Sequence, residues 1–397
     1  MMKEYINKTF IESLDLPMMK SFEDLVQNLR LSAKLVNWLT SSSSQKYQTF
    51  YLTKKDGSPR RIDAPVRSLK IVQRWILDNI LVKIRVSPYS FGFKSGEKGS
   101  PLVKCAEKHK NNLYILKVDL KNFYPSIKKE RVYYTFLDLG YNSSVANLLT
   151  NVCVKDDYLP QGAVTSAYLA NLICRDLDYR IAGYCNKRDI IYTRYADDLT
   201  FSCDNRETLH KSLFTIRRII EGEKFQLNTN KIHFMTPKCR KSVLGITLNE
   251  NSIKAPYEMK RMVRSVIHYQ IATGDYADND KIRGYISYIN SIEETYKAQI
   301  ISYIQKLTES QLCLFEELVE AFNKNKLYQE LPDMISRDAD DFVNVYEEDE
   351  VPLSESVDKM TIQFGFIFAV YAITYGFIFL LSWLSEKYLG NFGTNTL

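Results

Sequence analysis

Residues 190–202 read IIYTRYADDLTFS and place two adjacent aspartates, Asp197 and Asp198, between two runs of β-branched and aromatic residues. Such runs on both sides of a short polar break are typical of a β-hairpin, so we expect the aspartates at its turn. Two neighbouring carboxylates repel each other and favour a bound divalent cation. An isolated Asp-Asp pair is also an ordinary solvated turn, because aspartate is a favoured turn residue. The rest of the chain must decide between these two interpretations.

The composition describes a large, basic and aromatic-rich protein. At 397 residues the chain has room for two or three domains, and it contains 27 tyrosines and 20 phenylalanines. The formal charge of +6 includes −9 from residues 330–359 and nothing from residues 360–397, so residues 1–329 carry +15. A body this basic, with aromatics interleaved, favours a polyanionic partner such as nucleic acid. General solubility charge remains the alternative.

The cysteines argue against two kinds of structural site. All seven are scattered singly, with no Cys-x-x-Cys pair, and the four histidines are scattered too. An odd, unpatterned set is atypical of a disulfide framework or a zinc ribbon. Residues 1–15 have no uninterrupted apolar core, so we identify no signal peptide there. We therefore expect the main body to fold in a reducing cytosol.

The C-terminal part of the chain is of a different kind. Residues 360–385 contain no charged residue and, as a helix, would span about 39 Å, enough to cross a bilayer core of about 30 Å. We expect one transmembrane helix here, with a buried core helix as the alternative. Residues 329–359 are acidic, contain few aromatics and are typical of a solvated linker. Residues 386–397 form a short tail.

Hydrophobic periodicity predicts the remaining elements. Residues 113–118 are typical of a buried strand that ends at Asp119, and a lone aspartate there suits a helix N-cap as well as a ligand. Helices are expected over residues 69–80, 102–110 and 166–184, and a helical, basic region over residues 257–307. Further strands are expected over residues 226–234 and 243–248.

Six motifs follow one another in order within residues 20–310. The series contains a basic segment with Arg60 and Lys70, VDLKNFYPS (118–126), LPQGAVTS (159–166), YADD (195–198), Lys231 and VLG (243–245). Each motif alone is weak, but the ordered set resembles the reverse transcriptases. The segments LDYR (177–180) and YTRY (192–195) and the pair Arg283-Gly284 are similar to the bacterial retron group.

The resemblance implies a fold class and a division of the chain. The fold class is α+β: a right-hand polymerase fold with fingers, a palm built on an antiparallel sheet and a helical thumb, plus one C-terminal transmembrane helix. The expected parts are an N-terminal helical segment (1–50), fingers and palm (51–240), a primer-grip hairpin with the helical thumb (241–328), the acidic linker (329–359), the transmembrane helix (360–385) and the tail (386–397).

The resemblance also implies the catalytic residues. Joining a nucleotide to a 3′-hydroxyl is a phosphoryl transfer in which two Mg²⁺ ions stabilise both ends of the displacement. Asp119 and Asp197 are expected to bridge the metals, with Asp198 in support. Lys231 matches a palm lysine suited to protonating the pyrophosphate leaving group.

Four further residues match positions that contact the incoming nucleotide. Arg60 and Lys70 resemble cations placed against the triphosphate, with Arg61 as the alternative to Arg60. Tyr124 matches the aromatic steric gate that excludes a ribose 2′-hydroxyl, and a plain core aromatic is its alternative. Gln161 matches the residue that packs beside the nucleotide.

Two motifs linked in the family to recognition of its own RNA are altered here. CAEKH (105–109) stands where the retron pattern has Asn-Ala-x-x-His, and VLG (243–245) stands where it has Val-Thr-Gly. We expect His109, Val243 and Gly245 to take part in nucleic-acid binding with altered specificity. Thumb cations should hold the template–primer by phosphate contacts; these are Lys260, Arg261, Arg264 and Arg283.

The expected partners are deoxynucleotides, a cognate structured non-coding RNA and its DNA copy as branched RNA–DNA, and a membrane reached through residues 360–385. The expected function is synthesis of that DNA in an anti-phage defence system, with the membrane helix as effector and possible site of homo-oligomerisation. The alternative is another defence-associated or mobile-element reverse transcriptase that is merely tethered. The expected location is the bacterial inner membrane, single-pass, with the catalytic domain in the cytoplasm.

Overall fold

The computed structural model describes residues 7–41, 44–54, 57–94, 99–249, 251–274 and 276–310. The acidic linker, the predicted transmembrane helix and the tail (329–397), with the last part of the predicted thumb, lie outside these residues. Within the described ranges no helix is both long enough and apolar enough to cross a membrane. The chain divides into two units: Met1–Pro101 with Asn111–Lys241, and Leu102–Lys110 with Ser242–Leu397.

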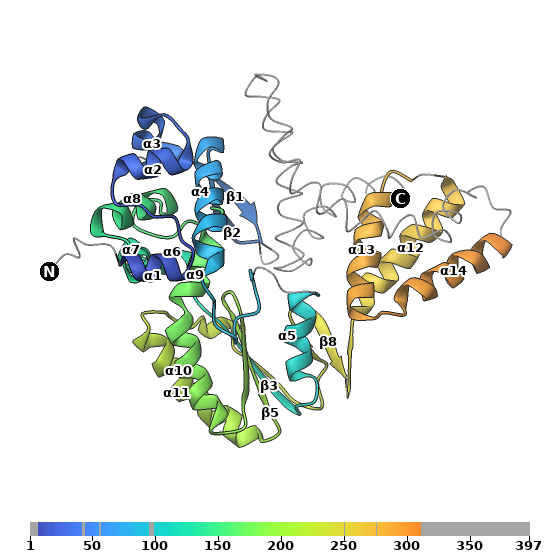
Figure 1. Cartoon of the computed structure of the whole chain (residues 1–397). Helices are drawn as coiled ribbons and strands as arrows, with labels where there is room; N and C mark the ends of the chain where they lie inside the picture. Colours follow the sequence, from blue (N-terminus) through green and yellow to red (C-terminus); the bar gives the residue numbers. More distant parts are fainter. Residues whose placement is uncertain are drawn as a thin grey trace. The chain divides into compact units, whose positions relative to one another are not determined.

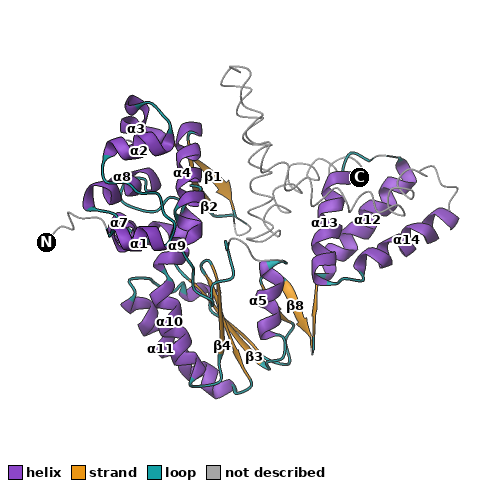
Figure 2. Cartoon of the chain, in the orientation of Figure 1, coloured by secondary structure: helices purple, strands orange, loops and turns teal. Residues whose placement is uncertain are grey.

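The first unit contains a four-stranded antiparallel sheet, which we call the central sheet (Figure 1, Figure 2). Its order is β4 (Ile191–Tyr195), β5 (Asp198–Cys203), β3 (Tyr114–Asp119) and β6 (His233–Met235). The predicted hairpin around YADD is confirmed, because β4 pairs with β5 and Tyr195 lies opposite Asp198. The predicted strand over residues 113–118 is also confirmed, and Asp119 is its last residue rather than a helix cap.

The two faces of this sheet differ in chemistry, because successive side chains of a strand point to opposite sides. One face buries Leu116, Val118, Leu199 and Phe201. Two helices pack along that face (Figure 1): α10 (Arg175–Asn186) and α11 (Arg206–Gly222). The other face carries Lys117, Asp119 and Asp198, which strand pairing places side by side.

Two expected elements differ from the structure. The helix expected over residues 166–184 is divided into α9 (Ser166–Ile173) and α10 at Cys174, which has φ −84° and ψ 4°. The strand expected over residues 226–234 is interrupted by the 3₁₀ turn Thr229–Lys231, which is followed by the short strand β6. Before the turn, Leu227 forms an antiparallel bridge with Leu120, and the main-chain N–H of Asn228 donates to the carbonyl of Asp119 at 2.8 Å.

The first unit also contains a two-stranded hairpin and a group of helices (Figure 1). The hairpin consists of β1 (Tyr47–Thr53) and β2 (Pro59–Pro65), and the predicted helix over residues 69–80 is confirmed as α4 (Arg67–Asn79). The remaining helices of this unit are α1 (Lys8–Ser13), α2 (Phe22–Leu29), α3 (Ala33–Thr40), α6 (Phe123–Ser126), α7 (Lys129–Asp138) and α8 (Ser143–Cys153), with short 3₁₀ helices at Ser44–Lys46 and Leu81–Lys83.

The second unit combines a small sheet with a helical bundle. Its elements are α5 (Pro101–His109), the predicted polar helix, then β7 (Lys241–Val243), β8 (Ile246–Asn249), β9 (Ser252–Lys254), α12 (Tyr257–Thr273), α13 (Asn279–Ile292) and α14 (Tyr296–Ser310). The run expected as one strand over residues 243–248 is a hairpin, because Leu244 and Gly245 have φ +50° and +81°. Positive φ at two successive residues closes a tight two-residue turn, which glycine adopts without strain.

Candidate active site

Three aspartates belong to the end of β3 and to the β4–β5 hairpin beside it. Asp119, the last residue of β3, lies directly opposite Asp198, the first residue of β5. Asp197 occupies the turn between β4 and β5, and its carbonyl accepts a hydrogen bond of 3.0 Å from the main-chain N–H of Leu120. The end of β3 and the turn are therefore held together by main-chain pairing, whatever their side chains do.

The electrostatics of the aspartates are unfavourable without a cation. Burial raises the pKa of Asp198 above its usual value, and the charge of Asp119 acts in the same direction. Lys117 and Lys231 oppose this rise. Like charges held opposite each other destabilise a sheet, so this corner stores repulsion that a bound cation would relieve.

Two side chains hold Asp119 in place. The ammonium of Lys231 lies 3.1 Å from Oδ1 of Asp119, and the Asn228 side-chain amide donates to Oδ2 at 3.2 Å. The structure thus brings Lys231 to the aspartates, as the motif order implied. Asn228 was missed by sequence reasoning. Its signal was a polar, turn-forming residue inside a run that otherwise resembled a strand.

The donor chemistry of this corner fits Mg²⁺, which prefers carboxylate oxygens and water. Asp119, Asp197 and Asp198 supply such oxygens from two strand ends and the turn between strands. In the described part of the chain, no three His, Cys, Asp or Glu side chains already converge as a complete metal cage. One oxygen of Asp119 instead contacts the Lys231 ammonium. A positively charged group, the Lys231 ammonium, thus already lies against a carboxylate of this site.

The hairpin β1–β2 carries Arg60 and Arg61 on opposite sides of one strand. The Arg61 guanidinium pairs with Asp63, Nη2 to Oδ1 at 3.1 Å, and lies over the Tyr158 ring at 5.7 Å from its centroid. Asp63 is almost fully buried and also pairs with Lys155. Arg60 precedes Arg61 in β2 and therefore points to the other side of the strand. Arg61 is engaged by Asp63, and both arginines remain candidates for the triphosphate.

The loop that carries Gln161 is tied to two neighbouring elements. The Asp63 N–H donates to the Gln161 carbonyl at 2.8 Å, and the Val164 N–H donates to Oε1 of Gln73, on α4, at 3.2 Å. A Cβ at Gly162 would lie 3.0 Å from the carbonyl oxygen of Asp63, and this residue has φ +121°. Only glycine fits this approach. The elements that carry Arg60, Lys70 and Gln161 are therefore fastened together.

Lys70 and Tyr124 occupy half-buried positions in the first unit. Burial lowers the pKa of Lys70, so its ammonium is partly stripped of water and is favoured by an approaching anion. Tyr124 belongs to the short helix α6, and its ring lies 5.2 Å from that of the buried Phe123. This contact holds one side of Tyr124 while the residue stays accessible.

The structure revises the expectation for two residues of the second unit. His109 and Val243 are completely buried, so their side chains are not placed to touch nucleic acid directly. Burial lowers the pKa of His109 to about 3, and the imidazole is therefore neutral at physiological pH. Gly245 lies in the β7–β8 turn described above.

The four thumb cations differ in how they are engaged. Arg261 and Arg264 are exposed on α12, and Arg264 lies over the Tyr303 ring at 5.7 Å from its centroid. Lys260 pairs with the buried Glu293 at 2.8 Å, and Arg283 is largely covered and pairs with Asp280 at 2.9 Å. Arg261 and Arg264 therefore fit phosphate contacts best, and the other two have structural partners already.

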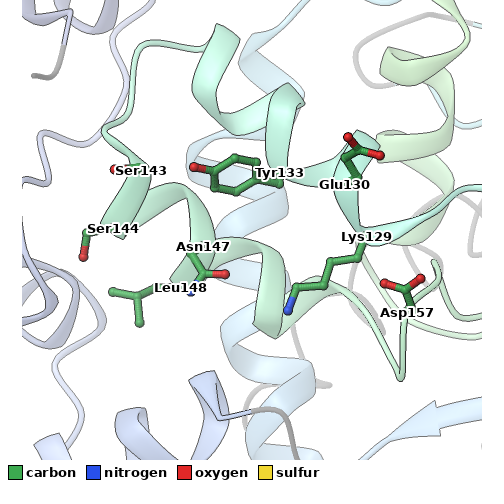
Figure 3. A pocket seen from close by; sticks show the side chains of 8 residues that line it. All are labelled: Lys129, Glu130, Tyr133, Ser143, Ser144, Asn147, Leu148 and Asp157. Atoms are coloured by element: carbon green, nitrogen blue, oxygen red, sulfur yellow. The ribbon is translucent and has the colours of Figure 1, made fainter. Parts of the chain in front are cut away.

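A groove lies elsewhere in the first unit, between the first turns of α7 and α8 (Figure 3). Its volume is about 610 Å³. Lys129 and Asp157 lie at one end and Ser143 and Ser144 at the other (Figure 3). None of the predicted site residues lines it. The active-site assignment therefore rests on the strand ends of the sheet and not on this groove.

Comparison with known proteins agrees with the motif order. The family described as reverse transcriptase (RNA-dependent DNA polymerase) matches residues 52–248. The chain is 35% identical over 306 residues to the retron Ec86 reverse transcriptase of Escherichia coli, covering 77% of this chain and 94% of the relative. It is 29% identical to the retron Mx65 reverse transcriptase of Myxococcus xanthus, covering 70% of this chain and 69% of that relative.

Among solved structures, telomerase from Candida albicans in complex with a fragment of telomeric RNA shows only a weak similarity. The TM-score is 0.40 at 11% identity, over 66% of this chain and 56% of that one. We draw no conclusion from a similarity of this size. The sequence relatives are sufficient: the chain belongs to the retron-type reverse transcriptases and is an RNA-directed DNA polymerase.

Proposed function

We propose that this reverse transcriptase copies part of a cognate structured non-coding RNA into single-stranded DNA, leaving branched RNA–DNA, within an anti-phage defence system. The observation that carries the catalytic part is the strand register that sets Asp119 opposite Asp198, with Asp197 in the adjoining turn. The similarity to relatives named as retron enzymes supports the choice of template.

In this proposal the aspartates hold the metals and Lys231 handles a proton. Asp119 and Asp197 would bind two Mg²⁺ ions, with Asp198 in support. The chemistry that Mg²⁺ supplies when bound is neutralisation of charge on the attacking and leaving oxygens. Lys231, held at 3.1 Å from Asp119, donates its proton to the departing pyrophosphate. Asn228 keeps the Asp119 carboxylate oriented through its amide.

The fingers residues select and orient the incoming deoxynucleotide. Arg60 and Lys70 contact the triphosphate, where a desolvated cation binds an anion strongly. Gln161 packs beside the nucleotide, and Tyr124 blocks a ribose 2′-hydroxyl. Arg261 and Arg264 of α12 hold the template–primer by its phosphates, because A-form helices hide their major-groove base edges.

Substitution of Asp119 or Asp197 by asparagine tests the catalytic assignment. An amide is a neutral and weaker ligand for Mg²⁺, so primer extension should fall by about a thousandfold or more. Extension of a DNA primer on an RNA template measures this directly. The matched control is Asp176→Asn, at an exposed aspartate in the first turn of α10. Normal synthesis by Asp119→Asn or Asp197→Asn would refute the two-metal assignment.

Tyr124→Ala tests the steric gate. Its preference for deoxynucleotides over ribonucleotides should drop by about tenfold or more, because a missing side chain opens space for the 2′-hydroxyl. Competing incorporation of dNTP and rNTP gives the ratio. Tyr134→Ala, at an exposed tyrosine on α7, is the control. Unchanged discrimination in Tyr124→Ala would return Tyr124 to a core aromatic.

We propose that residues 360–385 anchor the enzyme in the bacterial inner membrane as a single helix, with the catalytic domain in the cytoplasm. The absence of charge over these residues supports this. Homo-oligomerisation of the helix and damage to the membrane would be the effector step. Deletion of residues 360–397 separates effector from tether: an effector predicts intact DNA synthesis with defence lost, and a tether predicts intact synthesis with partial defence.

Sequencing the nucleic acid that co-purifies with the full chain tests the template. A branched chimera of RNA and DNA is expected. Recovery of unbranched DNA copies of many unrelated RNAs would favour another defence-associated or mobile-element enzyme.

A further inference from the structure

Beneath the catalytic turn lies an arginine that the reaction itself does not use. Arg194, in β4, is completely buried, as is its partner Asp178 of α10. Its Nε donates to Oδ1 of Asp178 and its Nη2 donates to Oδ2, both at 2.7 Å. The Tyr192 hydroxyl adds a third hydrogen bond to Asp178 at 2.8 Å. This geometry locks the guanidinium plane in one orientation.

The remaining guanidinium nitrogen reaches the catalytic turn. Nη1 of Arg194 donates to the carbonyl oxygen of Ala196 at 3.2 Å and to Oδ1 of Asn171 at 3.0 Å. Ala196 immediately precedes Asp197 and has φ +55°, a left-handed conformation that alanine rarely adopts. Such a residue persists where its surroundings over-determine it. The hydrogen bond to its carbonyl is one of those constraints.

The same network reaches a third segment of the first unit. The Asn171 amide donates to the Gly92 carbonyl at 2.7 Å, and its oxygen accepts from the Ser90 hydroxyl at 2.9 Å. The main-chain N–H of Arg194 donates to the carbonyl of Tyr89, and its carbonyl accepts from the N–H of Phe91, both at 2.8 Å. Arg194 thus connects the hairpin, two helices and the segment Tyr89–Gly92.

We infer that Arg194 is a positioning residue: its Nη1, oriented by Asp178 and Asn171, fixes the carbonyl of Ala196 and so aims the carboxylates that follow. This inference rests on the proposed roles of Asp197 and Asp198. Lysine cannot replace arginine here, because a single ammonium cannot bind both oxygens of Asp178 and still reach two further acceptors in a fixed plane. Lysine would keep the positive charge at position 194, but the carbonyl of Ala196 would no longer be held in a fixed position.

The test compares Arg194→Lys with Arg131→Lys in the full chain. Arg131 is a half-buried arginine of the same unit that donates to the main-chain carbonyls of Glu223 and Ile173, outside the hairpin. For Arg194→Lys we expect kcat of primer extension to fall by about tenfold to a hundredfold, with KM for dNTP changed by less than about twofold. Arg131→Lys should leave both constants near the parent values.

Hydrogen exchange without added metal supplies a readout that is independent of activity. In Arg194→Lys, amides of residues 190–203 should exchange faster, while the rest of the sheet keeps its protection. Tyr192→Phe, which removes one hydrogen bond and keeps the ion pair, should show the same pattern at smaller amplitude. If Arg194→Lys does not fold, the exchange pattern of Tyr192→Phe tests the inference in its place.

Two results would overturn the inference. One is a folded Arg194→Lys enzyme with parental kcat. The other is a general rise in exchange with kcat and KM changed together, as for a purely structural pair. Both results leave the catalytic assignment standing if Asp119→Asn and Asp197→Asn are inactive, so the two failures can be told apart.

Discussion

The two faces of the central sheet handle buried charge in opposite ways. On the face covered by α10, Arg194 and Asp178 are both fully buried and form a matched ion pair with two hydrogen bonds of 2.7 Å. On the other face, Asp119 and Asp198 lie opposite each other with the same sign of charge. Lys231 offsets part of that repulsion, and its side chain is half exposed.

The contrast between the two faces shows that one hairpin carries both a charge that stabilises the fold, on Arg194, and a charge suited to binding a cation, on Asp198. A buried charge with a fully satisfied partner resists change, because removing either member leaves the other unpaired. Carboxylates of like charge are kept at an energetic cost, which is useful where a cation must bind. The stable Arg194–Asp178 pair on one face can therefore hold the hairpin in place while Asp119 and Asp198 repel each other on the other face. The predictions below alter one charge on each face, and one compensated carboxylate in the second unit.

Breaking the matched pair should have the largest effect on stability. Asp178→Asn leaves the buried Arg194 without a counter-charge, so the free energy of unfolding should fall by about 3–5 kcal/mol. Urea denaturation measures it. The control is Glu223→Gln, which breaks the more exposed pair with Arg180 and should cost about 1 kcal/mol or less. An equal loss of unfolding free energy in Asp178→Asn and Glu223→Gln would contradict the special role given to the buried pair.

A compensated carboxylate in the second unit extends the comparison. Glu293 accepts from the Ala255 N–H and from Lys260, both at 2.8 Å, and lies 3.5 Å from Lys254. Burial would raise its pKa, but these hydrogen bonds and charges outweigh burial and lower it below the usual 4.5. Its contribution is therefore present above pH 4.5 and is lost as the pH falls through the lowered pKa.

Glu293→Gln should thus reduce the free energy of unfolding by about 1–2 kcal/mol at pH 7 and by less at pH 3. Denaturation at the two pH values gives the comparison. A difference from the parent that grows on acidification would have the wrong sign and would refute the assigned cause.

Relieving the repulsion should have the smallest effect, and the opposite sign. In the presence of a chelator, Asp198→Asn should raise the free energy of unfolding by about 1 kcal/mol, because like charges opposite each other destabilise a sheet. Thermal melting measures the gain, and primer extension should be lost. Added Mg²⁺ should stabilise the parent more than the variant, so that the difference between their free energies of unfolding becomes smaller. A lower melting temperature with chelator would show that repulsion is not what Asp198 contributes.

Much of the fold could be predicted because its signals are local. The hairpin around YADD, the strand ending at Asp119 and the helices α4 and α5 follow from periodicity within short windows. The break at Cys174 could not, because no glycine or proline marks it, and the turn after Asn228 was marked only by polar, turn-forming residues. Asn228, just before that turn, donates hydrogen bonds to Asp119, a residue 109 positions away.

The site was predictable to the same extent. Motif order identified Asp119 and Lys231, and the structure joins them at 3.1 Å. It did not reveal that His109 is buried, because a histidine on a helix has the same local pattern whether it faces solvent or a core. It also did not reveal that Arg61 pairs with the buried Asp63 and lies over the Tyr158 ring, because both contacts depend on how the chain folds around β2.

The sequence by itself determined the types of residue available for chemistry and the short elements that carry them: carboxylates at strand ends, a basic body and an uncharged C-terminal segment. Only the tertiary structure decided which charges face each other. It set Asp119 against Asp198 and Arg194 against Asp178, on opposite sides of one sheet. The physical reason is that strand register and helix packing are long-range, and a shift of one residue would exchange the two faces.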